Sequence, residues 1–356
     1  MTGVACLLTG RQGVLSDLSP AACHIASGYT TRVDPDAMQS AGDHMIHDLA
    51  GLEMDLYGTS CPQCSGPARI EYTVWSDVFA CPACGSDLLF WEFGVDHESG
   101  AIRKELECDC GARSPKRALT WQRAEPVFES ISCAACTGRI NRPIDGDQRS
   151  RVLAFDRDAI SRWYPQHPFE DWREMWRGQH GAQGILTAAD FYTTRNLHGL
   201  AEMWHAISTY GDNEVGQALR FAFTAIVNRA SRRYQWNPKR PTNVLSSTMY
   251  IASLSYEFNV FSLLRRKLST ASRLYRATAD LPGTAVVYKS PAQRLEHIPD
   301  RSVNYVFTDP PFGSNIFYAD SSFLWEAWLG ELTDQSAEIV VNRQRPPNQG
   351  GKTTAD

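Results

Sequence analysis

Four close pairs of cysteines between residues 61 and 136 constrain the fold of this 356-residue chain more than any other feature. The first two pairs are CxxC knuckles, Cys61-Pro-Gln-Cys64 and Cys81-Pro-Ala-Cys84, separated by sixteen residues. Each knuckle supplies two soft thiolates from one tight turn, and tetrahedral zinc takes four such ligands. We therefore predict a structural zinc ion bound by Cys61, Cys64, Cys81 and Cys84, with unrelated buried thiols as the alternative.

The other two pairs form a less regular set. Cys108-Asp-Cys110 has one residue between its cysteines, and Cys133-Ala-Ala-Cys136 is another CxxC. We predict a second zinc ion bound by these four residues, with a mixed or single-metal arrangement as the alternative. Cysteine fills every position of both sets and leaves no coordination site for water, which indicates structural rather than catalytic metal. The isolated Cys6 and Cys23 are expected to pack in the core.

Composition limits the class of protein. The length predicts about two domains, or one domain with a large insertion. Lys and Arg number 35 against 40 Asp and Glu, and the net charge of −5 excludes a protein coated in positive charge but not a local basic face. No segment approaches the ~18 apolar residues of a membrane span. The N-terminus lacks the basic start of a secretory signal, so a cytoplasmic protein is expected.

Four regions differ in their residue pattern. Residues 1–24 predict a helix, a strand ending at Asp17, and a second helix capped by Ser19 with Pro20 in its first turn. Residues 58–140 predict a small cysteine-rich inserted module. Residues 150–280 are mainly helical in pattern, with apolar stripes such as Leu197, Leu200, Trp204 and Ile207. Two strands are predicted beyond them, at 285–288 and 303–308.

The segment that follows the second of these strands carries the clearest chemistry. Asp309-Pro310-Pro311-Phe312 places a carboxylate, a rigid turn with free carbonyls, and an aromatic face in four residues. The exocyclic amine of a nucleobase is a poor nucleophile, because its lone pair is delocalised into the ring. Asp309 and the Pro310 carbonyl can accept the two amine hydrogens and free that lone pair, while Phe312 stacks on the ring. An ordinary Asp-Pro turn is the alternative.

This motif resembles that of the amino-group DNA methyltransferases, which use S-adenosylmethionine and carry a D/N/S-P-P-Y/F sequence. The chain looks most like the large prokaryotic DNA methylases with inserted zinc knuckles. The segment from Gly10 to Pro20 resembles the family's second strand, whose terminal acid, here Asp17, binds the cofactor ribose. Ser290 stands where the family's third strand contacts the cofactor adenine, often through an aspartate. The resemblance gives Asp309 a place in the cofactor site as well, and the segment Phe191–Asn196 resembles the family's "FxTxRN" helix start.

The resemblance implies an α/β chain with a partial Rossmann-like methyltransferase sheet, an inserted zinc-ribbon module and a helical segment. The expected domains are residues 1–57 and 284–356 from the methyltransferase core, 58–140 as the zinc-ribbon insertion, and 141–283 as the helical segment. The family's glycine-rich loop would fall just before Met1, and only about forty residues follow the Asp309 motif. We therefore expect an internal piece of a longer methylase.

The expected activity is methyl transfer from S-adenosylmethionine to adenine N6 in DNA, with the base flipped out of the stack. Methylation of cytosine N4, methylation of an RNA amine, and a non-catalytic zinc-containing protein that binds nucleic acid remain alternatives. DNA is the expected partner, and a restriction or defence-system partner is a further candidate. The basic residues between 229 and 276 fit contacts to phosphates and a solvated helix face equally well.

Overall fold

The chain begins with a helix, a strand and a second helix, as predicted. In the computed structural model, which describes residues 1–237, 248–310, 313, 315–341 and 344, these are α1 (Thr2–Leu8), β1 (Gln12–Asp17) and α2 (Pro20–Thr30). The Ala22 amide donates to the Ser19 hydroxyl at 3.2 Å, so Ser19 caps α2. β12 (Thr284–Lys289) pairs with β1 in parallel, which confirms the strand predicted at 285–288.

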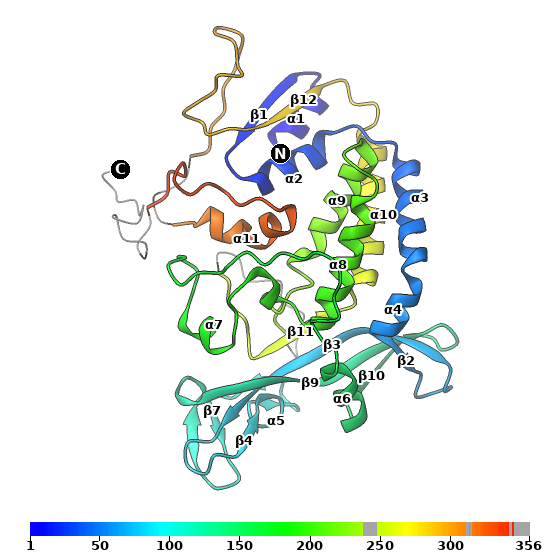
Figure 1. The fold of residues 1–356 in the computed structure, drawn as a ribbon, viewed down its shortest axis with the longest axis vertical. Helices are drawn as coiled ribbons and strands as arrows, with labels where there is room; N and C mark the ends of the chain where they lie inside the picture. The colour runs from blue at the N-terminus through cyan, green and yellow to red at the C-terminus, as the bar shows by residue number, and fades with distance from the viewer. Residues whose placement is uncertain (238–247, 311–312, 314, 342–343, 345–356) are drawn as a thin grey trace.

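A helical body packs beside this pair of strands. Figure 1 shows α3 (Pro35–Asp48), α8 (Thr194–Ser208), α9 (Glu214–Val227) and α10 (Val260–Thr278) lying side by side. The predicted apolar stripes face this core: Leu197, Leu200 and Ile207 of α8 are buried, although Trp204 is only half-buried. The remaining helices are α4 (Ala50–Tyr57), α5 (Phe90–Phe93), α6 (Gly146–Leu153), α7 (Gly178–Ala182) and α11 (Tyr318–Leu329), with 3₁₀ turns at Lys116–Ala118 and Ala188–Phe191.

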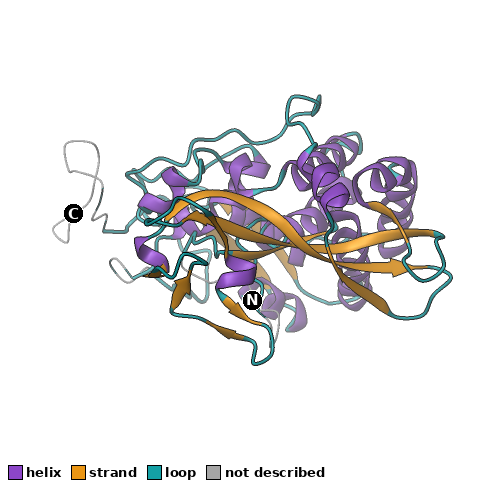
Figure 2. Ribbon diagram, turned by 90° about the horizontal axis from the view of Figure 1, so that it is seen from below, coloured by secondary structure: helices purple, strands orange, loops and turns teal. Residues whose placement is uncertain are grey.

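A long antiparallel sheet runs below the helices in Figure 1, and in Figure 2, seen from below, it lies in front of them. Its order is β10 (Arg139–Pro143), β9 (Thr120–Cys133), β3 (Pro67–Ala80) and β11 (Leu254–Phe258). The short strands β2 (Gly58–Ser60) and β4 (Asp87–Leu89) pair with the two ends of β3. Two small hairpins, β5 (Val95–Asp96) with β6 (Ala101–Ile102) and β7 (Glu105–Glu107) with β8 (Arg113–Pro115), complete the cysteine-rich region. Because β11 comes from the helical segment, the sheet joins that segment to the cysteine-rich region.

The strand predicted at 303–308 is absent, and that prediction is wrong. The segment has no strand assignment, and no described strand pairs with it. Its apolar side chains are exposed, with Tyr305 at 79 % and Val306 at 70 % of full exposure. A strand forms by pairing with the edge of a neighbour, and local apolar composition alone does not supply that edge.

Among the helices of the described residues, none has both the length and the apolar character that crossing a membrane requires.

Candidate metal centres and active site

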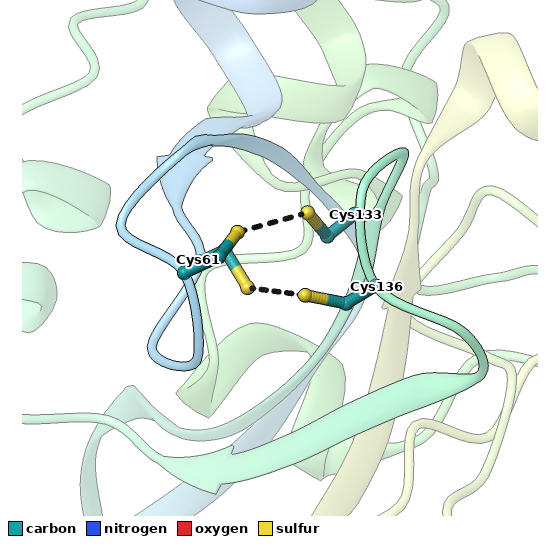
Figure 3. Close-up of side chains that lie close together, drawn as sticks. Cys61, Cys133 and Cys136 are labelled. Carbon is teal, nitrogen blue, oxygen red and sulfur yellow. Dashed lines mark hydrogen bonds between the residues drawn. The ribbon is translucent and has the colours of Figure 1, made fainter.

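The first group of four cysteines lies where β2, β3 and β9 meet. Cys61 and Cys64 lie in the turn between β2 and β3. Cys133 ends β9 and Cys136 lies in the turn that follows it, and Figure 3 shows both beside Cys61. The Sγ atoms of Cys61 and Cys136 are 3.8 Å apart, and those of Cys64 and Cys133 are 3.6 Å apart. The turn is closed by the Cys61 amide, which donates to the Gly66 carbonyl at 2.9 Å. Two loops from distant parts of the sequence thus present four sulfurs to one point.

The second group lies at the opposite end of β3. Cys81 and Cys84 follow that strand directly, and Cys108 and Cys110 follow β7. The sulfurs of Cys81 and Cys110 are 3.8 Å apart, and those of Cys84 and Cys108 are 3.6 Å apart. Hydrogen bonds from the side chain and backbone of Ser86 lower the pKa of the Cys84 thiol to about 6. A lowered pKa favours the thiolate, the form that binds metal.

The spacing of the sulfurs fits a four-coordinate metal ion. A zinc ion about 2.3 Å from each sulfur places the four sulfurs about 3.8 Å apart in a regular tetrahedron. In each group two of the sulfur–sulfur separations are 3.6–3.8 Å, close to that edge, and all four sulfurs lie within 4.8 Å of one another. A disulfide needs a separation of about 2.05 Å, so all eight cysteines are free. Both groups could therefore hold a structural metal ion.

The grouping of the cysteines corrects the prediction from sequence. Cys61 and Cys64 pair with Cys133 and Cys136, and Cys81 and Cys84 pair with Cys108 and Cys110. The prediction that the first two knuckles bind one shared metal ion is therefore wrong. The fourteen residues of β3 lie between those knuckles and span about 45 Å at ~3.3 Å per residue. The antiparallel partner β9 instead places Cys133 opposite Ala68, beside the first knuckle.

Two of the three residues expected to contact the cofactor, Asp17 and Ser290, meet at the carboxyl ends of β1 and β12. The Ser290 amide donates to the Asp17 carbonyl at 2.9 Å, and the Ser16 hydroxyl donates to the Ser290 carbonyl at 3.0 Å. One oxygen of the Asp17 carboxylate accepts from the Ser19 amide at 2.9 Å, which fixes the orientation of the side chain. Asp17 is exposed and Ser290 is half-buried, so both remain accessible.

Helix α11, which follows the Asp309 motif, docks beside these strand ends. The Ser19 hydroxyl donates to Glu326 at 2.6 Å, and Lys289 forms an ion pair with Glu331. At the other end of α11, the buried Asp320 pairs with Arg173 at 2.9 Å. The helix that follows the motif in the sequence thus contacts the Asp17–Ser19 turn.

The motif itself is only partly described. Asp309 and Pro310 are exposed, and the Asp309 carboxylate makes no hydrogen bond or ion pair to the described residues. Pro311 and Phe312 lie outside the described residues. The structure thus brings Asp17 and Ser290 together and leaves the contact between Asp309 and these two residues as a prediction.

The expected helix start at Phe191–Asn196 has a structural role that sequence reasoning missed. Arg195 forms a buried ion pair with Glu257 of β11, and Thr193 donates to the same carboxylate. Asn196 accepts from the Tyr57 hydroxyl at 2.6 Å. Polar residues inside an apolar helix pattern could have indicated this structural role from the sequence, because a buried polar group requires a hydrogen-bonding partner.

Comparisons with known proteins add no relative to this description. No family model matches the chain, and searches of curated proteins and of solved structures find no match either. The function must therefore be argued from the residues and their arrangement.

Proposed function

We propose that this protein is a DNA methyltransferase that transfers a methyl group from S-adenosylmethionine to an exocyclic amine, adenine N6 above all. One observation carries the proposal. Asp17 and Ser290 lie side by side at the carboxyl ends of two parallel strands, in a chain that also contains Asp309-Pro310-Pro311-Phe312. In open α/β sheets ligands bind at the carboxyl ends of the strands. A partial Rossmann-like sheet is the corresponding fold proposal.

The residues at the strand ends fit the proposed cofactor. One Asp17 oxygen is used by the Ser19 amide, and the other has no partner among the described residues, so it can accept from ribose hydroxyls. The Ser290 hydroxyl donates to the Arg294 carbonyl at 2.6 Å and keeps its acceptor capacity for an adenine amine. S-adenosylmethionine would supply an electrophilic methyl group on its sulfonium.

The Asp309 motif would hold the base that receives the methyl group. Asp309 and the Pro310 carbonyl would accept the two hydrogens of the amine, which favours a pyramidal nitrogen with a free lone pair. Phe312 would stack on the flipped base and hold it at attack distance. The two successive prolines limit the backbone freedom of this loop, so the acceptors are positioned before the base arrives.

Zinc is the metal proposed for both cysteine groups. Four thiolates in a tetrahedron select zinc or iron–sulfur chemistry, and two short turns that each give two ligands are typical of zinc. With four protein ligands at each ion, both sites would stabilise the fold and take no part in methyl transfer.

A chromosomal Asp309→Ala variant in the organism that encodes the protein tests the proposal. Removing one preorganised polar group typically lowers a rate by ~10²–10³, so the level of N6-methyladenine in digested genomic DNA should fall in mass spectrometry. Phe312→Tyr should retain methylation. The matched control is Asp300→Ala, because Asp300 is also exposed and precedes the motif. Loss of N4-methylcytosine instead would reassign the base, and unchanged levels of both modified bases would contradict the proposal.

A further inference from the structure

Three arginines from distant parts of the sequence converge beside the first cysteine group. Arg139 begins β10, Arg229 follows α9, and Arg266 lies in the second turn of α10. None of the three forms an ion pair with the described residues. Arg139 and Arg266 are exposed, and Arg229 is half-buried. They lie around Glu71. Arg139 is opposite Ser132, whose hydroxyl donates to the Glu71 carboxylate. The Arg229 guanidinium lies over Phe258, and the next residue, Asn259, donates its amide to the Glu71 carbonyl and caps α10, the helix that carries Arg266.

Arg229 is held rigidly within this group. Its guanidinium lies 4.7 Å from the ring centre of Phe258 and 5.0 Å from that of Tyr234. Such cation–π contacts orient the planar group without neutralising it. Its Nε is buried and has no hydrogen-bond partner. The side chain is therefore preorganised, and part of its hydrogen-bonding capacity is unused.

The surroundings offset the three charges only in part. The carboxylate of Glu71 accepts from the Ser132 hydroxyl at 2.6 Å and attracts both Arg266 and Arg265. The next carboxylate, Glu53, already pairs with both Arg265 and Arg69. Asp43 adds only a weaker attraction for Arg265. Burial and the charges of Arg229 and Arg139 lower the pKa of Arg266, although the charge of Glu71 acts in the opposite direction. A protein with a net charge of −5 thus concentrates positive charge at one place.

We propose that Arg139, Arg229 and Arg266 form a contact surface for the phosphodiester backbone of DNA. Guanidinium groups match phosphate oxygens in a bidentate geometry. Arginines that form no ion pair within the protein can therefore be attracted by the phosphates of DNA. Arg139 lies three residues after Cys136, so the first cysteine group fixes the position of the strand that presents it. The choice of DNA as the polyanion rests on the proposed function.

Fluorescence anisotropy of a labelled DNA duplex with the purified 356-residue protein tests this surface. The Arg139→Gln/Arg266→Gln double variant should weaken binding by at least about tenfold at low salt. The slope of log K against log salt should fall by about 0.9 for each phosphate that the variant no longer neutralises. Adding Arg229→Gln should weaken binding further. The control is Arg276→Gln, also on α10, because Arg276 already pairs with Asp36.

The double variant carries the test, because both of its side chains are exposed and neither contributes to the core. Wild-type affinity and salt slope in this variant would overturn the proposal. Binding of phosphatidylserine vesicles, with no binding of DNA, would overturn it in favour of a membrane surface. The level of methylated bases in the Asp309→Ala variant is measured independently of either result. The proposed DNA-contact surface can therefore be wrong while the proposed function is right, and the two experiments distinguish these cases.

Discussion

At the scale of single residues, the ion pair between Arg195 and Glu257 ties α8 to the long sheet. Both side chains are almost completely buried, at 2 % and 1 % exposure. The Glu257 carboxylate also accepts from the Trp75 indole at 2.7 Å and from the Thr193 hydroxyl. The Arg195 Nη2 that pairs with Glu257 also donates to the Thr73 hydroxyl at 2.7 Å. Such a pair is tolerated in the interior because its remaining hydrogen-bonding groups have partners.

We expect Arg195→Ala to lower the free energy of unfolding by about 3–5 kcal/mol, because it leaves the Glu257 charge buried and unpaired. Urea denaturation followed by circular dichroism measures this change. Arg276→Ala is the matched control, since it removes an ion pair that is 63 % and 80 % exposed. The control should lose no more than about 1 kcal/mol. Equal losses in the two variants would contradict the role assigned to burial.

His24 gives the stability of the protein a dependence on pH. Its Nε2 lies 2.9 Å from the Thr224 hydroxyl. Burial, and then the charge of Arg220, lower the pKa of His24 from 6.5 to about 4. The unfolded chain therefore takes up a proton on this residue at a higher pH than the folded chain does. The free energy of unfolding must fall as the pH drops from about 6.5 to about 4.

His24→Gln should remove this contribution. Between pH 7 and pH 5 the wild type should lose about 1–2 kcal/mol more than the variant, according to the size of the pKa change. Urea denaturation at the two pH values gives both losses. Glutamine keeps a polar group that can reach Thr224, so the variant should fold. The same loss in wild type and variant would show that His24 does not titrate as described.

At the scale of elements, features that depend on residues close in sequence were predicted correctly, whereas the pairing of distant segments was not. The cap of α2 by Ser19 and the short strand at 285–288 depend on residues close in sequence, and both predictions are confirmed. The grouping of the cysteines depends on the register between β3 and β9, which are forty residues apart in sequence. The run from Ile70 to Ala80 contains no Gly or Pro, and this was the signal that one long strand separates the knuckles.

Metal analysis of cysteine variants tests the grouping together with the identity of the metal. The wild type should bind about two zinc ions, one for each set of four thiolates. Cys61→Ser/Cys136→Ser should retain about one ion, because both residues belong to the same group. Cys61→Ser/Cys81→Ser should lose both ions, because it damages each group. Retention of one ion by this last variant would restore the grouping predicted from sequence.

At the scale of the whole molecule, the sequence indicated the residues of the candidate site but not how all of them meet. Asp17 and Ser290 end two strands, and parallel pairing alone brings them together. The position of Asp309 relative to them depends on the path of residues 291–308 and on the docking of α11, which no local pattern specifies. The basic residues between 229 and 276 likewise do not share one face. Arg265 and Arg276 are paired with acids, whereas Arg229 and Arg266 join Arg139 from another element.

The exposure of the strand ends determines how tightly the purified 356-residue protein should bind S-adenosylmethionine. Small-molecule sites bury most of the ligand surface, typically about 70–90 %. Here Asp17 is exposed and Ser290 half-buried, and on the same strands Val14 and Val286 are 46 % and 44 % exposed. Asp17 and Ser290 could contact the ribose and adenine, but most of the cofactor would stay in water.

We therefore expect calorimetry to give a dissociation constant of about 1 mM or weaker, which corresponds to about −4 kcal/mol. Asp17→Ala should abolish even this weak signal. Gly3 does not provide a glycine turn that could cover the cofactor. The space beside Gly3 is already filled by Leu15 and Thr30, each of which would lie 2.7 Å from a Cβ at that position. A micromolar constant would contradict the prediction, and it would require the exposed 303–308 segment to close over the strand ends when the cofactor binds.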